Sequence, residues 1–154
     1  MISYKTLSTL VVGLAAASAV QAADKKITRA ELPAAVEKTV AEQSKGAIVK
    51  GFSTEIENGK KLYEAQLTVD GHGRDISIDE SGRILEVEEE VAFTSLSPAV
   101  KDGLAKAAGT GTIGKVESLT KSGKLVAYEA VVQKGKKRSE IQVGPDGRKL
   151  AHPE

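Results

Sequence analysis

The chain has 154 residues, 40% of them hydrophobic and 28% charged, with 22 Lys and Arg against 21 Asp and Glu. This is the composition of a globular protein of one or two domains, not of a disordered chain. The sequence has no cysteine and only two histidines, which excludes disulfide frameworks, thiolate metal sites and cysteine nucleophiles and leaves few general bases near neutral pH.

The first 22 residues follow the order of a secretory signal peptide. Lys5 precedes an uncharged run from Leu7 to Val20, and Val20-Gln21-Ala22 supplies the −3 and −1 positions of a cleavage site. The run is shorter than the roughly 20 apolar residues that cross a bilayer. We expect cleavage after Ala22, a periplasmic or secreted mature chain and no membrane span after cleavage. An uncleaved N-terminal anchor is the alternative.

The rest of the chain contains the same pattern twice. Residues 31–41 match residues 95–105 at an offset of 64, and three later blocks, beginning at residues 62, 75 and 80, recur at an offset of 65. Such self-similarity is the sequence signature of an internal repeat. The predicted organisation is a signal peptide at 1–22, repeat 1 at 23–94 and repeat 2 at 95–154.

Each repeat is predicted to open with a short helix. In repeat 1, Leu32, Val36 and Val40 recur at i, i+4 and form one apolar stripe, and Thr28 with Glu31 fits a capping box before it. In repeat 2 an equivalent apolar stripe is expected, with Ser97 as the N-cap and Pro98 at N1. This helix is expected to end at Gly109.

Alternating apolar and polar residues then predict antiparallel strands with one covered face. In repeat 1 the alternation runs through residues 52–57, 63–69 and 75–79, and a fourth strand is expected through Leu85, Val87, Val91 and Phe93. Repeat 2 continues the order through residues 113–119, 125–133 and 138–143. The predicted fold class is therefore α+β, with two tandem repeats, each a short helix packed on a roughly four-stranded antiparallel sheet.

These motifs resemble PepSY-like domains. The resemblance lies in the Leu-Pro-Ala-Ala-Val helix opening at residue 32, the Tyr-Glu strands at residues 63 and 128, and the Gly-Arg turns at residues 82 and 147. PepSY-like domains are described as similar to β-lactamase inhibitory protein, which has two tandem helix-and-sheet repeats. The resemblance implies export and regulation or inhibition of an extracytoplasmic enzyme, with no catalytic residues to transfer. The absence of cysteine departs from that inhibitor, which relies on disulfides.

Four short segments could carry chemistry, and each also has a purely structural interpretation. His72, between two glycines, suits a hairpin turn better than a metal site. The acidic run at 86–90 could attract a cation or a basic partner, or be a strand edge or connector held in water. The Gly-rich stretch at 109–114 follows a helix and enters a strand, the reverse of a phosphate loop. The basic cluster at 134–138 lacks the aromatic residues that stack bases and is expected at a hairpin tip.

No motif supplies a nucleophile with its base, so we expect no enzyme, no cofactor and no metal site. Residues 24–94 carry a net charge of −5 and residues 95–154 a net charge of +5. The leading hypothesis is an exported binding module that inhibits or regulates an extracytoplasmic protein or peptidase, with a protein or peptide partner and no nucleic acid. The alternative is a periplasmic cation- or small-ligand-binding protein that uses the acidic first repeat.

The polar positions of the predicted strands define the expected partner-binding surface. If the helices cover one sheet face, these side chains share the other face and are free to contact a partner. The candidate partner-binding residues are Glu64, Gln66, Thr68, Asp75, Ser77, Glu129, Val131, Gln133, Glu140 and Gln142.

Overall fold

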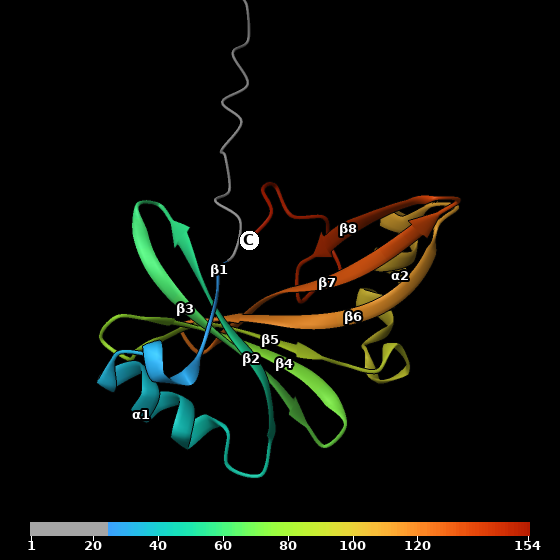
Figure 1. Ribbon diagram of the computed structural model, residues 1–154. Helices are drawn as coiled ribbons and strands as arrows, with labels where there is room; N and C mark the ends of the chain where they lie inside the picture. The colour runs from blue at the N-terminus through green and yellow to red at the C-terminus, as the bar shows by residue number, and fades with distance from the viewer. Residues whose placement is uncertain (1–24) are drawn as a thin grey trace, which may run out of the picture.

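The computed structural model describes residues 25–154, so the predicted signal peptide and its cleavage site lie outside the described residues. Eight antiparallel strands form one open sheet in chain order (Figure 1). The strands are β1 Lys25–Ile27, β2 Ile48–Glu57, β3 Lys60–Val69, β4 His72–Asp79, β5 Ile84–Glu90, β6 Thr112–Lys121, β7 Lys124–Lys134 and β8 Lys137–Val143. The helices are η1 Arg29–Glu31, α1 Ala34–Gln43, η2 Phe93–Ser95 and α2 Pro98–Ala108.

Local sequence signals explain where the helices begin and end. The Ser97 side chain accepts a hydrogen bond from the Val100 amide at 3.3 Å, Pro98 is the first helical residue, and Gly109 ends α2 with a φ of 59°. These three predictions are confirmed. The capping box of Thr28 and Glu31 is also present, but it caps the N-terminus of η1 and not that of α1. Helix α1 begins only after Pro33.

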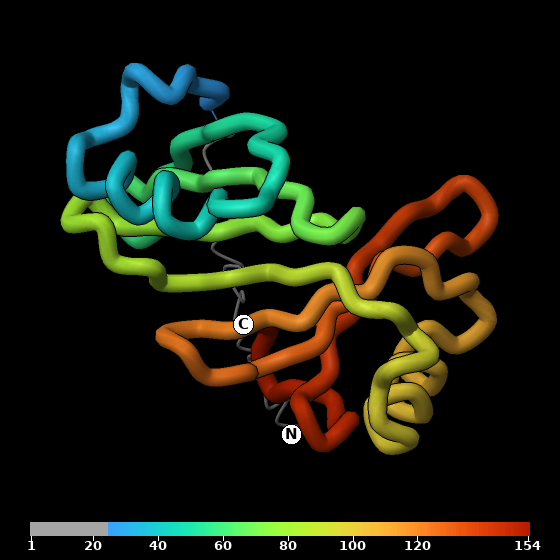
Figure 2. The backbone as a smooth tube through the Cα atoms, turned by 90° about the horizontal axis from the view of Figure 1, so that it is seen from below, coloured from blue at the N-terminus to red at the C-terminus, as the bar shows by residue number. Residues whose placement is uncertain are grey.

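Both helices pack on the same face of the sheet. Val87 packs in the core under α1, and Val91 packs in the core under α2. The two residues are four positions apart, so they point to the same side of the extended chain. Figure 2 shows the two helices at opposite ends of the sheet. The cores are centred on Val36, Val40, Ile76 and Ile78 in the first half and on Leu96, Val100, Leu104, Val116 and Val143 in the second.

A glycine turn docks on each helix in the same way. A Cβ added to Gly82 would lie 2.6 Å from the Ala35 carbonyl oxygen, and one added to Gly147 would collide with the carbonyl of Ala99. Both glycines also have a positive φ, 83° and 79°. Each repeat therefore uses a turn glycine so that its backbone can touch the first turn of its own helix.

The strand count differs between the halves, so four strands in each repeat are not confirmed. Repeat 1 contributes β2 to β5 and the short β1, whereas repeat 2 contributes β6 to β8 and only an isolated bridge, Val143 to Lys149, where a fourth strand was expected. The strand predicted through Phe93 was too long, because β5 ends at Glu90 and Phe93 opens η2. Within residues 25–154, every helix is too short or too polar to cross a bilayer.

Candidate functional site

We call the sheet surface opposite α1 and α2 the open face. Strand register places all ten predicted partner-binding residues there: Glu64 lies opposite Ser77, Gln66 opposite Asp75, and Glu129 opposite Gln142. The remaining four, Thr68, Val131, Gln133 and Glu140, follow by alternation along β3, β7 and β8. The prediction of a shared face therefore agrees with the register, and binding by these residues stays a prediction.

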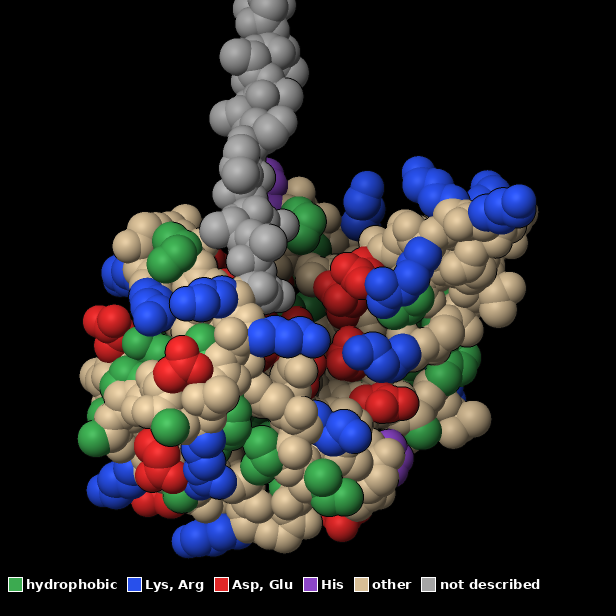
Figure 3. Space-filling view, viewed as in Figure 1, with side chains coloured by type: hydrophobic (Ala, Val, Ile, Leu, Met, Phe, Trp, Pro, Cys, Tyr) green, Lys and Arg blue, Asp and Glu red, His purple; other side chains and the backbone are tan. Residues whose placement is uncertain are grey.

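The open face carries many more carboxylates than the sequence analysis selected. In Figure 3 the Asp and Glu side chains gather in a hollow at the centre of the molecule, with Lys and Arg around it. The register sets Asp75 opposite Glu88, and Glu117 between Glu90 and Glu129. Directly opposed like charges destabilise a sheet. The acidic residues of this face are Glu55, Glu57, Glu64, Asp75, Asp79, Glu86, Glu88, Glu90, Glu117, Glu129 and Glu140.

The acidic run at 86–90 is neither a strand edge nor a connector, so that interpretation was wrong. It forms most of β5, which lies in the middle of the sheet between β4 and β6. Glu86, Glu88 and Glu90 point to the open face, whereas Glu89 points to the helix side and pairs with Arg74 at 2.5 Å. The period-two spacing of the three glutamates was the signal that could have identified them as part of the site.

Two of these carboxyl groups have a pKa raised well above the ordinary value. Burial raises the pKa of Glu88 to about 7, helped by the negative charges of Glu117, Glu86, Glu129 and Asp75. Burial likewise raises the pKa of Asp75 to about 6, with Glu64 and Glu117 acting in the same direction and Lys115 against them. Ionising both groups at neutral pH therefore costs free energy that a nearby cation would offset.

Cations and hydrogen bonds neutralise the margins of the acidic surface. Lys115 pairs with Glu117 at 2.7 Å and Lys121 with Glu86 at 3.4 Å. Burial acts to lower the pKa of Lys115, but its hydrogen bond to Glu117 and the surrounding carboxylates raise it overall. At the centre, by contrast, neither Asp75 nor Glu88 forms a hydrogen bond or ion pair with any residue that the structure describes.

The open face is hollowed, and the hollow joins both repeats. A depression of about 700 Å³ is lined from β2 to β8 and includes Ser77, Glu129, Glu140 and Gln142 of the predicted set. A smaller one of about 200 Å³ is lined by Glu64, Asp75 and Ser77 together with Glu55, Glu86 and Glu88. Four predicted residues, Gln66, Thr68, Val131 and Gln133, line neither depression.

The other segments singled out in the sequence have structural roles. Gly109 ends α2 and the stretch after it enters β6, as expected for a C-cap and loop. Residues 134–138 form the exposed tip of the hairpin of β7 and β8, as predicted. His72 opens β4 and is exposed. Across residues 25–154, no three His, Cys, Asp or Glu side chains are placed to hold a metal ion.

The fold is similar to solved structures of small Bacteroides proteins. A DUF2874 family protein from Bacteroides ovatus matches with a TM-score of 0.60 and 16% identity over 77% of this chain and 84% of that chain. A BLIP-like protein from Bacteroides fragilis matches with a TM-score of 0.56 and 20% identity over 75% and 81%. A proposed periplasmic protein from Bacteroides eggerthii matches with a TM-score of 0.63 and 14% identity over 77% and 85%.

These matches show a BLIP-like fold. At such low identity they carry the fold alone. No protein-family model matches the sequence, and no curated protein matches it. The resemblance to PepSY-like domains therefore stays a prediction from the sequence motifs.

Proposed function

We propose that this protein is an exported, non-catalytic binding module whose open face holds a Lys- or Arg-rich segment of another extracytoplasmic protein. The observation that carries the proposal is the pair of central carboxylates, Asp75 and Glu88, which form no hydrogen bond or ion pair within the described chain although negative charges surround them. A surface that is destabilised by its own like charges gains most from a partner that brings positive charge.

Two further observations support the class and the location. The depressions of the open face are broad and lie on the outer surface of a sheet, which suits a protein or peptide better than a buried small substrate. The predicted signal peptide and the periplasmic description of the Bacteroides eggerthii neighbour support action in the periplasm. The BLIP-like name of another neighbour and the sequence resemblance to β-lactamase inhibitory protein support an inhibitory role towards an extracytoplasmic protein or peptidase.

The test is affinity capture from the native periplasm, compared between the wild-type protein and a variant with a neutral open face. Asp75→Asn with Glu88→Gln removes the two unpaired carboxylates and keeps their shape. Glu64→Lys with Asp75→Lys reverses the charge of the same area. Glu42→Gln, on α1 at the other side of the sheet, is the matched control.

We expect the wild type and the control to enrich the same protein and both open-face variants to lose it. If the captured protein is an enzyme, its activity is then measured with and without the module. Equal capture by all four proteins would contradict the placement of the site. A thermal shift on adding Ca²⁺, without any captured protein, would favour the cation-binding alternative instead.

A further inference from the structure

The end of the hairpin of β7 and β8 carries lysines that have no partner within the chain. Lys134, Lys136 and Lys137 are exposed, and none of them forms an ion pair with any residue from 25 to 154. Strand register sets Lys134 directly opposite Lys137, and opposed like charges destabilise a sheet. Figure 1 shows the end of this hairpin at the outer margin of the molecule. We call these three lysines the basic tip.

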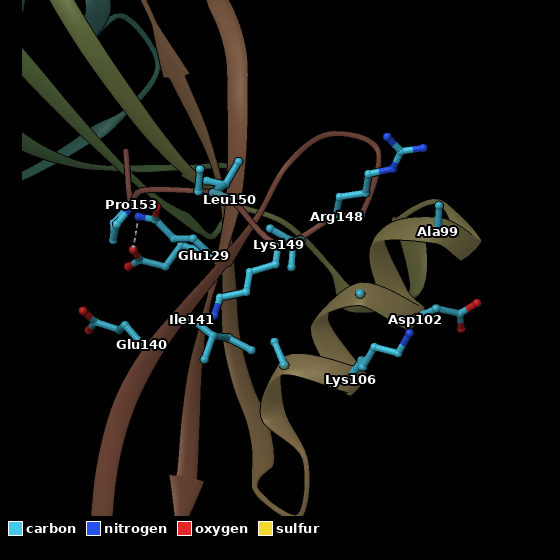
Figure 4. Close-up of a pocket in the computed structure, with 16 residues that line it drawn as sticks. Ala99, Asp102, Lys106, Glu129, Glu140, Ile141, Arg148, Lys149, Leu150 and Pro153 are labelled. Atoms are coloured by element: carbon cyan, nitrogen blue, oxygen red, sulfur yellow. Dashed lines mark hydrogen bonds between the residues drawn. The ribbon is translucent and has the colours of Figure 1, made fainter.

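The open face presents the opposite arrangement. Asp75 lies directly opposite Glu88, and neither has a hydrogen bond or ion pair within the described chain. Both line the depression of about 200 Å³, whose other lining residues also come from β2 to β5. The C-terminal segment lies elsewhere, because Figure 4 shows Lys149 and Leu150 beside the far end of the sheet, next to β7 and β8. This depression is therefore open to another molecule.

The two like-charge pairs have matching spacing. Side chains directly opposite each other in neighbouring antiparallel strands start from Cβ atoms about 4.5 to 5.5 Å apart. This holds for Lys134 with Lys137 and equally for Asp75 with Glu88. Two ammonium groups can therefore meet two carboxylates one to one. Such a contact removes the repulsion within both pairs at once.

A single copy cannot bring its own two pairs together. The register carries the row of Asp75 and Glu88 across β6 at Leu119 to Ala127 on β7. Lys134 lies seven residues further along the same strand, which is about 23 Å at about 3.3 Å per residue. A lysine side chain is much shorter than this, and both pairs belong to one continuous sheet. The contact therefore requires a second copy.

The shape of the hairpin suits an end-on approach. Figure 4 shows Ile141 directed towards α2 and Glu140 pointing away from it. Lys137 lies four residues before Ile141 and so shares the α2 side of β8. The hairpin ends in a turn of two residues, 135–136, and each lysine has a flexible four-carbon stem. Both ammonium groups can therefore bend forward past the turn, into the depression, while α2 of the same copy stays outside it.

We propose that copies of this protein associate head to tail, with the basic tip of one copy docked on Asp75 and Glu88 of the next. The inference rests on the proposed function in one respect, because both take the open face as a site for basic side chains. The net charges of −5 on residues 24–94 and +5 on residues 95–154 add attraction at longer range. Each copy offers one tip and one face, so the contact is heterologous and builds a chain or a closed ring.

Sedimentation equilibrium of the purified mature protein tests the contact. The average mass of the wild type should rise with concentration at about 50 mM salt and fall back at about 500 mM salt, where charges are screened. The tip variant is Lys134→Glu with Lys137→Glu, and the face variant is Asp75→Asn with Glu88→Gln. Each should raise the dissociation constant about tenfold or more.

A control and a mixing experiment identify the residues in contact. Lys38→Glu with Lys45→Glu changes the net charge as much as the tip variant does, at exposed lysines on and after α1, and should associate like the wild type. The tip variant keeps its acidic face and the face variant keeps its basic tip. Each alone should be monomeric, whereas their mixture should form a 1:1 complex and nothing larger. Circular dichroism checks that every variant is folded.

Three results would overturn the inference. One is a wild-type protein that stays monomeric up to about 1 mM at low salt, the weakest affinity that we would count as specific. Another is a folded tip variant that associates as tightly as the wild type. The third is a mixture of the two variants without a 1:1 complex, which would mean that these lysines and carboxylates do not meet.

Partner capture separates this inference from the proposed function. The tip variant has the complete open face and no tip to compete for it, so it should capture the periplasmic partner at least as well as the wild type. A wild type that associates through its tip, with equal capture by the wild type and the face variant, would support the inference and contradict the proposed function. Capture that depends on the open face, with a monomeric wild type, would overturn the inference alone.

Discussion

Glu88 is a carboxyl group in the middle of a sheet, with other acidic groups around it and no cation in contact. Partial burial disfavours its ionised form, as do the negative charges of Glu117 and Glu86. Asp75, directly opposite on β4, is in the same situation. Such groups cost stability, and their place in a hollow of the surface supports the proposed binding role.

The sign of the pH dependence follows from these raised pKa values. The folded state keeps its proton on Glu88 up to about pH 7, whereas the unfolded chain releases it near 4.5; for Asp75 the values are about 6 and 3.8. Between those limits the folded state binds more protons. The contribution of both groups to stability is therefore present at low pH and is lost as the pH rises through the folded pKa.

Replacement of Glu88 by glutamine should therefore stabilise the protein at pH 8. After discounting for solvent screening, we expect the free energy of unfolding to rise by about 1 to 2 kcal/mol there. At pH 5 the change should be small, because Glu88 is already neutral in the folded state. Urea denaturation at both pH values measures this. The control is Glu42→Gln on α1, and a stabilisation equal at both pH values would contradict the assigned pKa shift.

At the scale of elements, each helix is fixed to its repeat by one turn glycine. Gly147→Ala would place a methyl group against the backbone of Ala99 and would also force alanine into a positive φ of 79°. We expect a loss of about 2 to 4 kcal/mol in the free energy of unfolding, measured by urea denaturation. Gly82→Ala, at the equivalent turn under α1, should also be costly.

Gly71→Ala separates the cost of the positive φ from the cost of the collision. Gly71 has a φ of 87°, but an added Cβ would meet no atom within 4 Å. This variant therefore carries the backbone strain without the collision, and it should lose about 1 kcal/mol. Equal losses at Gly71 and Gly147 would contradict a cost from the collision with the backbone of Ala99.

The N-cap of α2 gives an independent check on the helix. Ser97→Ala removes the acceptor of the Val100 amide, which is then left without that partner at the start of the helix. A cap of this kind contributes about 1 kcal/mol. The variant should lower the midpoint of thermal unfolding, whereas Ser95→Ala, outside the helix, should have less effect.

Elements with strong local signals were predictable from the sequence. The Ser97-Pro98 start and the Gly109 end of α2 have local causes, and the structure has them where expected. The alternation along β3 and β4 was enough to place Glu64 and Asp75 on one face. Register between neighbouring hairpins follows from such patterns because side chains alternate strictly in strands.

The missed parts of the site depend on contacts between distant residues. The position of β5 in the middle of the sheet rests on its pairing with β6 from the next repeat, which no local pattern reveals. Glu117 and Lys115 were missed because the pairing of β6 with β7 is irregular between Ile113 and Val116, and this breaks the alternation. β1 was missed because three residues carry too little pattern.

For the whole molecule, stability and binding should respond to pH in opposite directions. A basic partner requires the ionised open face, so its affinity should rise between pH 5 and pH 8, as Asp75 and Glu88 lose their protons. Over the same range their contribution to fold stability falls. Each group that ionises fully on binding couples one proton to the interaction, which changes the affinity by up to about tenfold per pH unit within the titration range.

Calorimetric titration of the captured partner at several pH values tests this coupling. The wild type should bind more tightly at pH 8 than at pH 5 and release protons on binding at pH 6 to 7. The Asp75→Asn, Glu88→Gln variant should bind more weakly, with the pH dependence largely removed, because it has no proton to release at these positions. A variant that binds weakly but keeps the full pH dependence would mean that other groups of the complex titrate. The unpaired carboxylates would then serve only as fixed charges.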